Sequence, residues 1–143
     1  MIIALTLITG FYLFFLKPNT VPAQNLRIAQ LDIPVEIATT LEEQGRGLSG
    51  RASLPASNGL LFTFPRPDYY QFWMPDMNFP IDIIWINNNA VVDITADASN
   101  VFNPKKPIFY TPNFPAQYVL EVNSGFAKRN NINIGDPVKI PNL

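Results

Sequence analysis

The chain has 143 residues, of which 48% are hydrophobic and 13% aromatic, and its formal net charge is −1 at pH 7. This length supports one globular domain with a substantial core, and the scattered basic residues argue against a nucleic-acid partner. The chain has no cysteine and no histidine, which excludes disulfides, thiolate catalysis, the Ser-His-Asp triad and the commonest zinc ligands. We therefore expect neither a metal nor a cofactor.

Residues 1–23 are predicted to be a signal peptide or an N-terminal membrane anchor. The run from Ile2 to Leu16 is mostly apolar, and Lys17 and Pro18 end it. As a helix it would span about 22 Å, short of the roughly 30 Å of bilayer hydrocarbon, and small residues would permit cleavage after Ala23. No basic residue precedes the run, which leaves an uncleaved anchor open. We expect an extracytoplasmic location, periplasmic or secreted, with membrane contact only through this segment.

Residues 24–32 are expected to be a linker. Residues 33–141 are expected to form a domain of short strands, because prolines are frequent there and β-branched and aromatic residues fill the intervals between them. Strands are predicted at 33–38, 60–64, 69–74, 81–86, 90–95, 116–122 and 138–140. The run PRP is expected to end the second of these. The three asparagines at 87–89 predict a tight hairpin turn, since asparagine tolerates left-handed backbone conformations.

Two short helices are predicted between the strands. Thr40 and Glu43 have the spacing of a capping box, and Gly47 limits this helix to about two turns. Ser124 is expected to cap the second helix, and Lys128 and Arg129 suit the carbonyl end of its dipole. These elements predict a mainly β fold, either a single β-sandwich or a rolled, barrel-like sheet.

Charged residues within predicted strands are the strongest candidates for a site. Asp82 shares one face of its strand with isoleucines, and Glu121 is similarly placed among apolar neighbours. Arg46 and Arg51 follow the first helix, and either could pair with these carboxylates. The arginines and carboxylates form either two structural ion pairs that fix the helix to the sheet, or a polar pocket.

We predict a non-catalytic binding site for a small ligand, a glycan or an envelope protein. Its expected residues are Arg46, Arg51, Trp73, Met74, Asp82 and Glu121. In this hypothesis the arginines hold an anionic or hydroxyl-rich group and Trp73 supplies an apolar wall. Two alternatives stay open: a glycosidase-like hydrolase that uses two carboxylates, and a purely structural envelope protein.

Four ordered motifs carry a resemblance to a known family. They are EIATTLEEQGRGLSGR, LP followed by NGLLFTF, FWMPDMNFPIDIIWI, and YVLEVNSGFAKRNNINIGDPV. Together they resemble the domain-of-unknown-function family 192, also called uncharacterised protein family 0127, over about residues 33–140. Ser49 and Leu60 depart from the family's usual methionines. The resemblance implies a compact, mostly β, jelly-roll-like domain, often behind a signal peptide or anchor, with no assigned activity.

Overall fold

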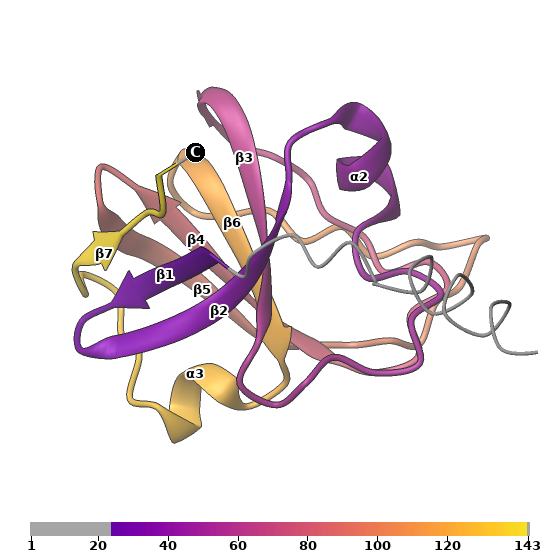
Figure 1. The fold of residues 1–143 in the computed structure, drawn as a ribbon. Coiled ribbons are helices and arrows are strands. Elements are labelled where there is room, and N and C mark those ends of the chain that lie inside the picture. Colours follow the sequence, from indigo (N-terminus) through magenta and orange to yellow (C-terminus); the bar gives the residue numbers. More distant parts are fainter. Residues whose placement is uncertain (1–23, 143) are drawn as a thin grey trace, which may run out of the picture.

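The structure, a computed structural model, describes residues 24–142 and contains one curled β-sheet with two short helices (Figure 1). In the described chain the strands are β1 (Gln24–Ile28), β2 (Leu31–Ala38), β3 (Gly59–Asp68), β4 (Ile81–Asn87), β5 (Ala90–Ala98), β6 (Ala116–Asn123) and β7 (Val138–Lys139). The helices are α2 (Leu41–Arg46) and α3 (Phe126–Arg129). The predicted mainly β fold is confirmed, and of its two predicted forms the rolled single sheet is the one observed.

The sheet has the strand order β5-β4-β6-β3-β2-β1-β7, and its one parallel pair is β2 with β3. This pair requires a crossover connection, residues 39–58, which carries α2. The two edges of the sheet meet at one end. The Val91 amide donates to the Asp136 carbonyl at 3.0 Å, and the Val138 amide donates to the Asn89 carbonyl at 2.7 Å. These bonds close the curl into a half-barrel.

The asparagine hairpin is confirmed between β4 and β5. Asn88 and Asn89 have φ values of 48° and 57°, both in the left-handed region. A two-residue turn of this kind matches the twist of the strands that it joins. The hairpin therefore fixes which residues of β4 face each side of the sheet.

Three strand predictions were wrong. Residues 24–32 are not a linker, because β1 and the start of β2 occupy them and pair with each other. β3 continues through the PRP run to Asp68, although its pairing with β6 becomes irregular after Thr63. The segment 69–74 forms only an isolated bridge, between Phe72 and Tyr110. Tyr110 lies in the connection between β5 and β6, where the structure has no strand for this segment to pair with.

The two helices begin differently. Thr40 caps α2 in a capping box with Glu43, as predicted, and Gly47 ends the helix with a φ of 50°. The Ser124 prediction was wrong, because Gly125 is the N-cap of α3 and makes no side-chain cap bond. The amides at this helix start are bound instead by a carboxylate from β4, described below.

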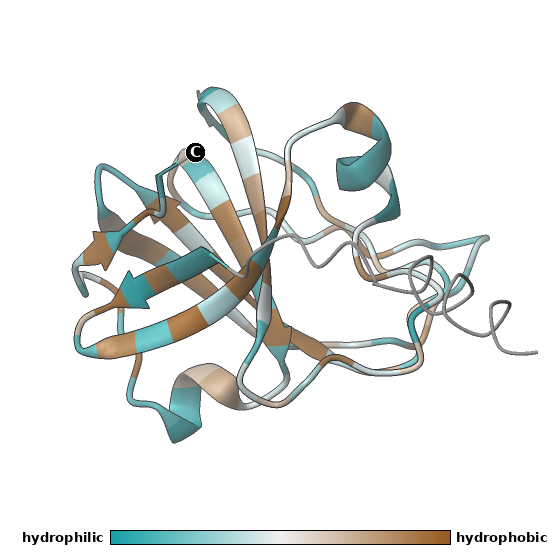
Figure 2. Ribbon diagram, in the orientation of Figure 1, coloured by the Kyte–Doolittle hydropathy of each residue, from teal (hydrophilic) through white to brown (hydrophobic). Residues whose placement is uncertain are grey.

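Two apolar cores lie on opposite faces of the sheet. The first contains residues from all seven strands together with α3, so it is the inside of the curl. The second core lies against the loop segments around residues 48–54 and 72–79 and includes Phe62 and Trp85. Figure 2 shows hydrophobic residues along β4, which is buried on both faces, and hydrophilic residues over most of α2. The helix α2, which lies over the second face, is therefore mostly polar.

The predicted signal peptide or anchor at residues 1–23 lies outside the described residues. From Gln24 to Asn142, neither helix has the length and apolar character that a membrane crossing would need.

Candidate functional site

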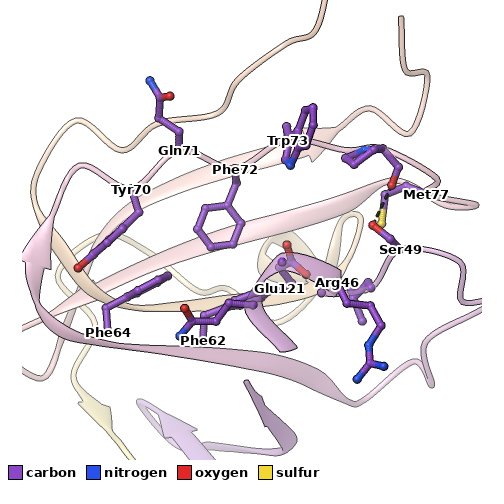
Figure 3. A pocket seen from close by; sticks show the side chains of 15 residues that line it. Arg46, Ser49, Phe62, Phe64, Tyr70, Gln71, Phe72, Trp73, Met77 and Glu121 are labelled. Atoms are coloured by element: carbon purple, nitrogen blue, oxygen red, sulfur yellow. Dashed lines mark hydrogen bonds between the residues drawn. The ribbon is translucent and has the colours of Figure 1, made fainter. Parts of the chain in front are cut away.

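A cavity of about 220 Å³ lies on the second face of the sheet, between α2 and the loop that follows β3. Residues from α2 and the turn after it form one wall, and residues 70–77 form the other. The lining side chains that are labelled in Figure 3 are Arg46, Ser49, Phe62, Phe64, Tyr70, Gln71, Phe72, Trp73, Met77 and Glu121. The cavity is mainly aromatic, with one acidic side chain.

That acidic side chain is Glu121 of β6. Its strand alternates between the two faces, so Glu121 points to the second face while Leu120 and Val122 enter the first core. Only 6% of Glu121 is exposed, and its Oε2 atom has no hydrogen-bond partner within residues 24–142. Figure 3 shows the carboxyl group directed into the cavity. A buried oxygen that has no partner among the described residues and faces an open space is a sign of a ligand site.

Burial also changes the chemistry of this carboxyl group. Loss of hydration raises the pKa of Glu121 to about 8, and the positive charge of Arg51 only partly opposes this effect. The group is therefore mostly uncharged at neutral pH. An uncharged carboxyl can both donate and accept a hydrogen bond, which a carboxylate cannot do.

The aromatic side chains hold one another in place. Phe62 and Phe72 meet edge to face with ring centroids 4.9 Å apart, and Phe72 contacts Trp85 in the same manner at 5.4 Å. Phe64 and Tyr70 stack at 3.7 Å. Such contacts restrict ring rotation, so the wall of the cavity is formed before any ligand enters.

The opposite wall is fixed by polar contacts from α2 and the turn after it. The Gln44 side chain donates to the Thr63 carbonyl at 2.8 Å, and the Ser49 hydroxyl donates to the Pro75 carbonyl at 2.8 Å. Gly47 allows close approach, because a Cβ there would lie 3.3 Å from the ring of Phe62. These contacts join the crossover to both β3 and the segment 70–77.

Asp82, predicted to belong to the site, lies on the opposite face of the sheet. Its Oδ1 accepts from the amides of Asp97 and Gly125 at 3.0 and 3.1 Å, and its Oδ2 accepts from the Ala127 amide at 3.0 Å. The bonds from Gly125 and Ala127 replace the missing side-chain cap of α3. Asp82 is thus a structural residue that ties α3 to β4, and no arginine within residues 24–142 forms an ion pair with it.

The two predicted arginines also have different surroundings. Arg51 forms a bidentate pair with Glu36, with both N–O distances at 2.8 Å, and this hydrogen bonding lowers the pKa of Glu36. Arg46 lines the cavity, but Figure 3 shows its guanidinium group turned away from Glu121. One arginine–carboxylate pair therefore does form near the first helix, but its acidic partner, Glu36, is one that the sequence did not indicate.

Trp73 and Met74, which were predicted to lie together in the site, occupy different places in the structure. Trp73 lines the cavity and is 50% exposed, whereas Met74 is buried in the second core and the cavity has Met77 instead. Of the six predicted residues, the structure brings Arg46, Trp73 and Glu121 together at one cavity. The aromatic members Phe62 and Phe64 were missed, although their alternation within one strand is the signal that could have placed them on a shared face.

Comparison with known proteins gives a family but no activity. The sequence profile of DUF192, described as "Uncharacterized ACR", matches residues 24–140. No curated protein matches the chain. A protein of unknown function from Novosphingobium aromaticivorans DSM 12444 has a similar structure, with 30% identity, a TM-score of 0.73, and coverage of 81% of this chain and 84% of that one.

A second similar structure is described as a putative transcription regulator from Sinorhizobium meliloti 1021. It shares 25% identity and a TM-score of 0.73, and the match covers 81% of this chain and 92% of that chain. Both structures share the curled sheet described above. The family profile covers most of the chain, and the chain therefore belongs to the uncharacterised DUF192 family.

Proposed function

We propose that this protein is a binding module for a small molecule, which it holds in the cavity above Glu121. The observation that carries the proposal is the buried Oε2 of Glu121, which lacks a partner in the part of the chain that the structure describes and faces an aromatic cavity. A buried polar atom without a partner is costly, and a ligand that supplied a hydrogen bond would remove that cost.

The size and lining of the cavity limit the ligand. A cavity volume of about 220 Å³ suits a small molecule with a single sugar or aromatic ring. Phe72 and Trp73 would contact a flat face, and the uncharged Glu121 would bond to a hydroxyl, amide or carboxyl group. A protein partner or a longer glycan would place only a single ring or side chain inside.

The hydrolase alternative receives no support from the geometry. Glycosidase-like cleavage needs two carboxyl groups on either side of one bond. Asp82 and Glu121 are on opposite faces of the sheet, and no other aspartate or glutamate of the described chain lines the cavity. We therefore propose binding without catalysis.

The proposal keeps the extracytoplasmic location that residues 1–23 predict. Its support is the sequence alone: an apolar run followed by small residues at a cleavage position. Cell fractionation, with N-terminal sequencing of the recovered protein, tests this part. Recovery of the uncleaved chain from the cytoplasmic fraction would contradict it.

Isothermal titration against a panel of monosaccharides, small aromatic acids and amides tests the binding site. We expect at least one compound to bind, and Glu121→Met, which removes the donor and the acceptor at a similar side-chain length, to weaken it about tenfold, because one hydrogen bond to a buried group is worth roughly that factor. Asp82→Asn is the control, since it changes a buried carboxylate on the other face. An equal loss of affinity in the two variants, or unchanged affinity in Glu121→Met, would contradict the proposed site.

A further inference from the structure

The loop of residues 99–115, named here the aromatic loop, has a defined shape although it contains no long strand. The Lys106 amide donates to the Asn103 carbonyl at 3.0 Å and makes a turn at its tip. Its base is held by the two backbone bonds between Phe72 and Tyr110, at 2.9 and 2.8 Å, and by the Ser99 amide, which donates to the Tyr110 hydroxyl at 3.0 Å. Figure 1 shows the loop extending away from the strands.

Several large apolar side chains on this loop face solvent. Val101 is 80% exposed and Ile108 is 57% exposed, and they lie on the two arms that flank the turn. Phe109 is 50% exposed and stacks on Trp73, with ring centroids 6.0 Å apart. Single exposed apolar residues are ordinary, but these three on one ordered loop, with the exposed Trp73 stacked on one of them, indicate an interaction surface.

The charge of the loop is one-sided. Lys105 and Lys106 are exposed at the turn, and the sequence from residue 98 to residue 115 contains no aspartate or glutamate. Asp97, just before the loop, accepts a hydrogen bond from the Ser124 hydroxyl. Two lysines on the same loop as exposed Val, Ile and Phe side chains are complementary to a surface that is anionic outside and apolar beneath.

We propose that the aromatic loop docks on an anionic lipid surface, with the exposed side chains of Trp73, Val101, Ile108 and Phe109 at the headgroup boundary and Lys105 and Lys106 against the lipid phosphates. Amphipathic surfaces of this composition lie in the interface plane and do not span the bilayer. This contact is additional to any contact through residues 1–23. It does not depend on a ligand in the cavity.

Trp73 provides the measurement. The chain has two tryptophans, and Trp85 is fully buried, so contact with lipid changes the emission of Trp73. The full chain is mixed with phosphatidylcholine vesicles that contain brominated lipid, with or without phosphatidylglycerol. We expect quenching that increases with the phosphatidylglycerol fraction and is absent in a Trp73→Phe variant.

Two further variants separate the apolar and charged contributions. Replacement of Val101, Ile108 and Phe109 by serine should abolish quenching while the chain remains folded, because these side chains are exposed. Lys105→Gln with Lys106→Gln should reduce docking by about fivefold per lysine. The matched control is Lys128→Gln with Lys139→Gln, which removes the same charge from α3 and β7 and should leave quenching unchanged.

Residues 1–23 could hold the chain on vesicles by themselves, so co-sedimentation alone does not decide the question. Vesicle-bound chain with an unquenched Trp73 would overturn the proposal, as would equal quenching on neutral and anionic vesicles. Concentration-dependent self-association that disappears in the triple serine variant, without quenching by lipid, would assign the surface to a protein partner and would also overturn it.

Discussion

Asp82 and Glu121 are buried carboxyl groups on adjacent strands, yet their surroundings are opposite. Across the β4–β6 pair, Asp82 faces Val122 and Glu121 faces Ile83, so the two side chains leave the sheet on different faces. Asp82 accepts three amide hydrogen bonds, whereas Glu121 has an oxygen that no group between Gln24 and Asn142 bonds to. One carboxyl group completes the structure around it, and the other is left open toward a cavity.

The difference shows how to distinguish a buried carboxyl group that stabilises the fold from one that belongs to a candidate binding site. Both residues look alike in the sequence, as an acidic side chain in an apolar strand. A carboxylate that is saturated by backbone amides stabilises the fold and has little capacity left for a ligand. A carboxyl group with unused hydrogen-bonding capacity costs stability, and such residues are typical of binding sites.

The largest expected effect is on the Asp82 side. Asp82→Ala should lower the free energy of unfolding by about 3–5 kcal/mol, because three amides lose their acceptor at once. Urea denaturation at pH 7 measures this. Asp32→Ala, which breaks only the exposed pair with Arg27, should change the stability little. Similar decreases in the free energy of unfolding in these two variants would contradict the structural role assigned to Asp82.

Glu121 should give a dependence of stability on pH. Its folded pKa of about 8 lies above the ordinary value of 4.5, so the folded state binds the extra proton between these values. The stabilisation is complete below pH 4.5 and is lost as the pH rises through 8, with a slope of at most about 1.4 kcal/mol per pH unit. The chain has no histidine, so few other groups titrate in this window.

Glu121→Gln should therefore flatten the profile of unfolding free energy between pH 5 and pH 8. The amide is close in size and cannot ionise, so it keeps the uncharged state at every pH. Denaturation series at four pH values measure the slope. Parallel profiles in the wild-type protein and the variant would mean that Glu121 ionises normally.

A smaller effect is expected at the wall of the cavity. Thr40→Ala removes the side-chain cap of α2 and should cost about 1 kcal/mol, because the Glu43 amide loses its 3.2 Å bond. Thermal unfolding measures the loss, and Thr111→Ala, at an exposed loop position, is the matched control. Since α2 borders the cavity and not Asp82, ligand affinity should fall in this variant as well. Unchanged affinity would show that α2 does not shape the site.

The smallest effect concerns Arg51. Its charge lowers the pKa of Glu121, so Arg51→Gln should move the titration midpoint of Glu121 upward from about 8. Stability should change by less than about 1 kcal/mol, as for most partly exposed ion pairs. NMR of the labelled carboxyl carbon follows the titration. Glu36→Gln is the control, because it breaks the same pair but keeps the arginine, and a rise in both variants would exclude a direct charge effect.

Local features of this fold were predictable from the sequence. The capping box at Thr40 and Glu43, the asparagine turn and the alternation in β4 each depend on residues a few positions apart. The strand β1 was missed because its residues show no clear strand pattern in the sequence. It forms a strand through its pairing with β2 and β7. Segment 69–74 has strand-like residues but lacks a neighbouring strand.

The site was predictable only in part. Alternation placed Asp82 and Glu121 within their strands, but it could not show which face carries α2. That depends on the parallel pairing of β2 with β3, a long-range contact without a sequence signature. The partner of Arg51 is Glu36, fifteen residues earlier, and only the folded chain brings the two together.

The crossover between β2 and β3 also has an evolutionary consequence. Because a parallel pair cannot be joined by a tight turn, the chain must travel a long path there, and this path forms one side of the cavity. Substitutions or length changes in residues 39–58 could alter which compound fits while the seven paired strands stay as they are. If the cavity binds a ligand as proposed, relatives with the same scaffold could differ in ligand preference through this single connection.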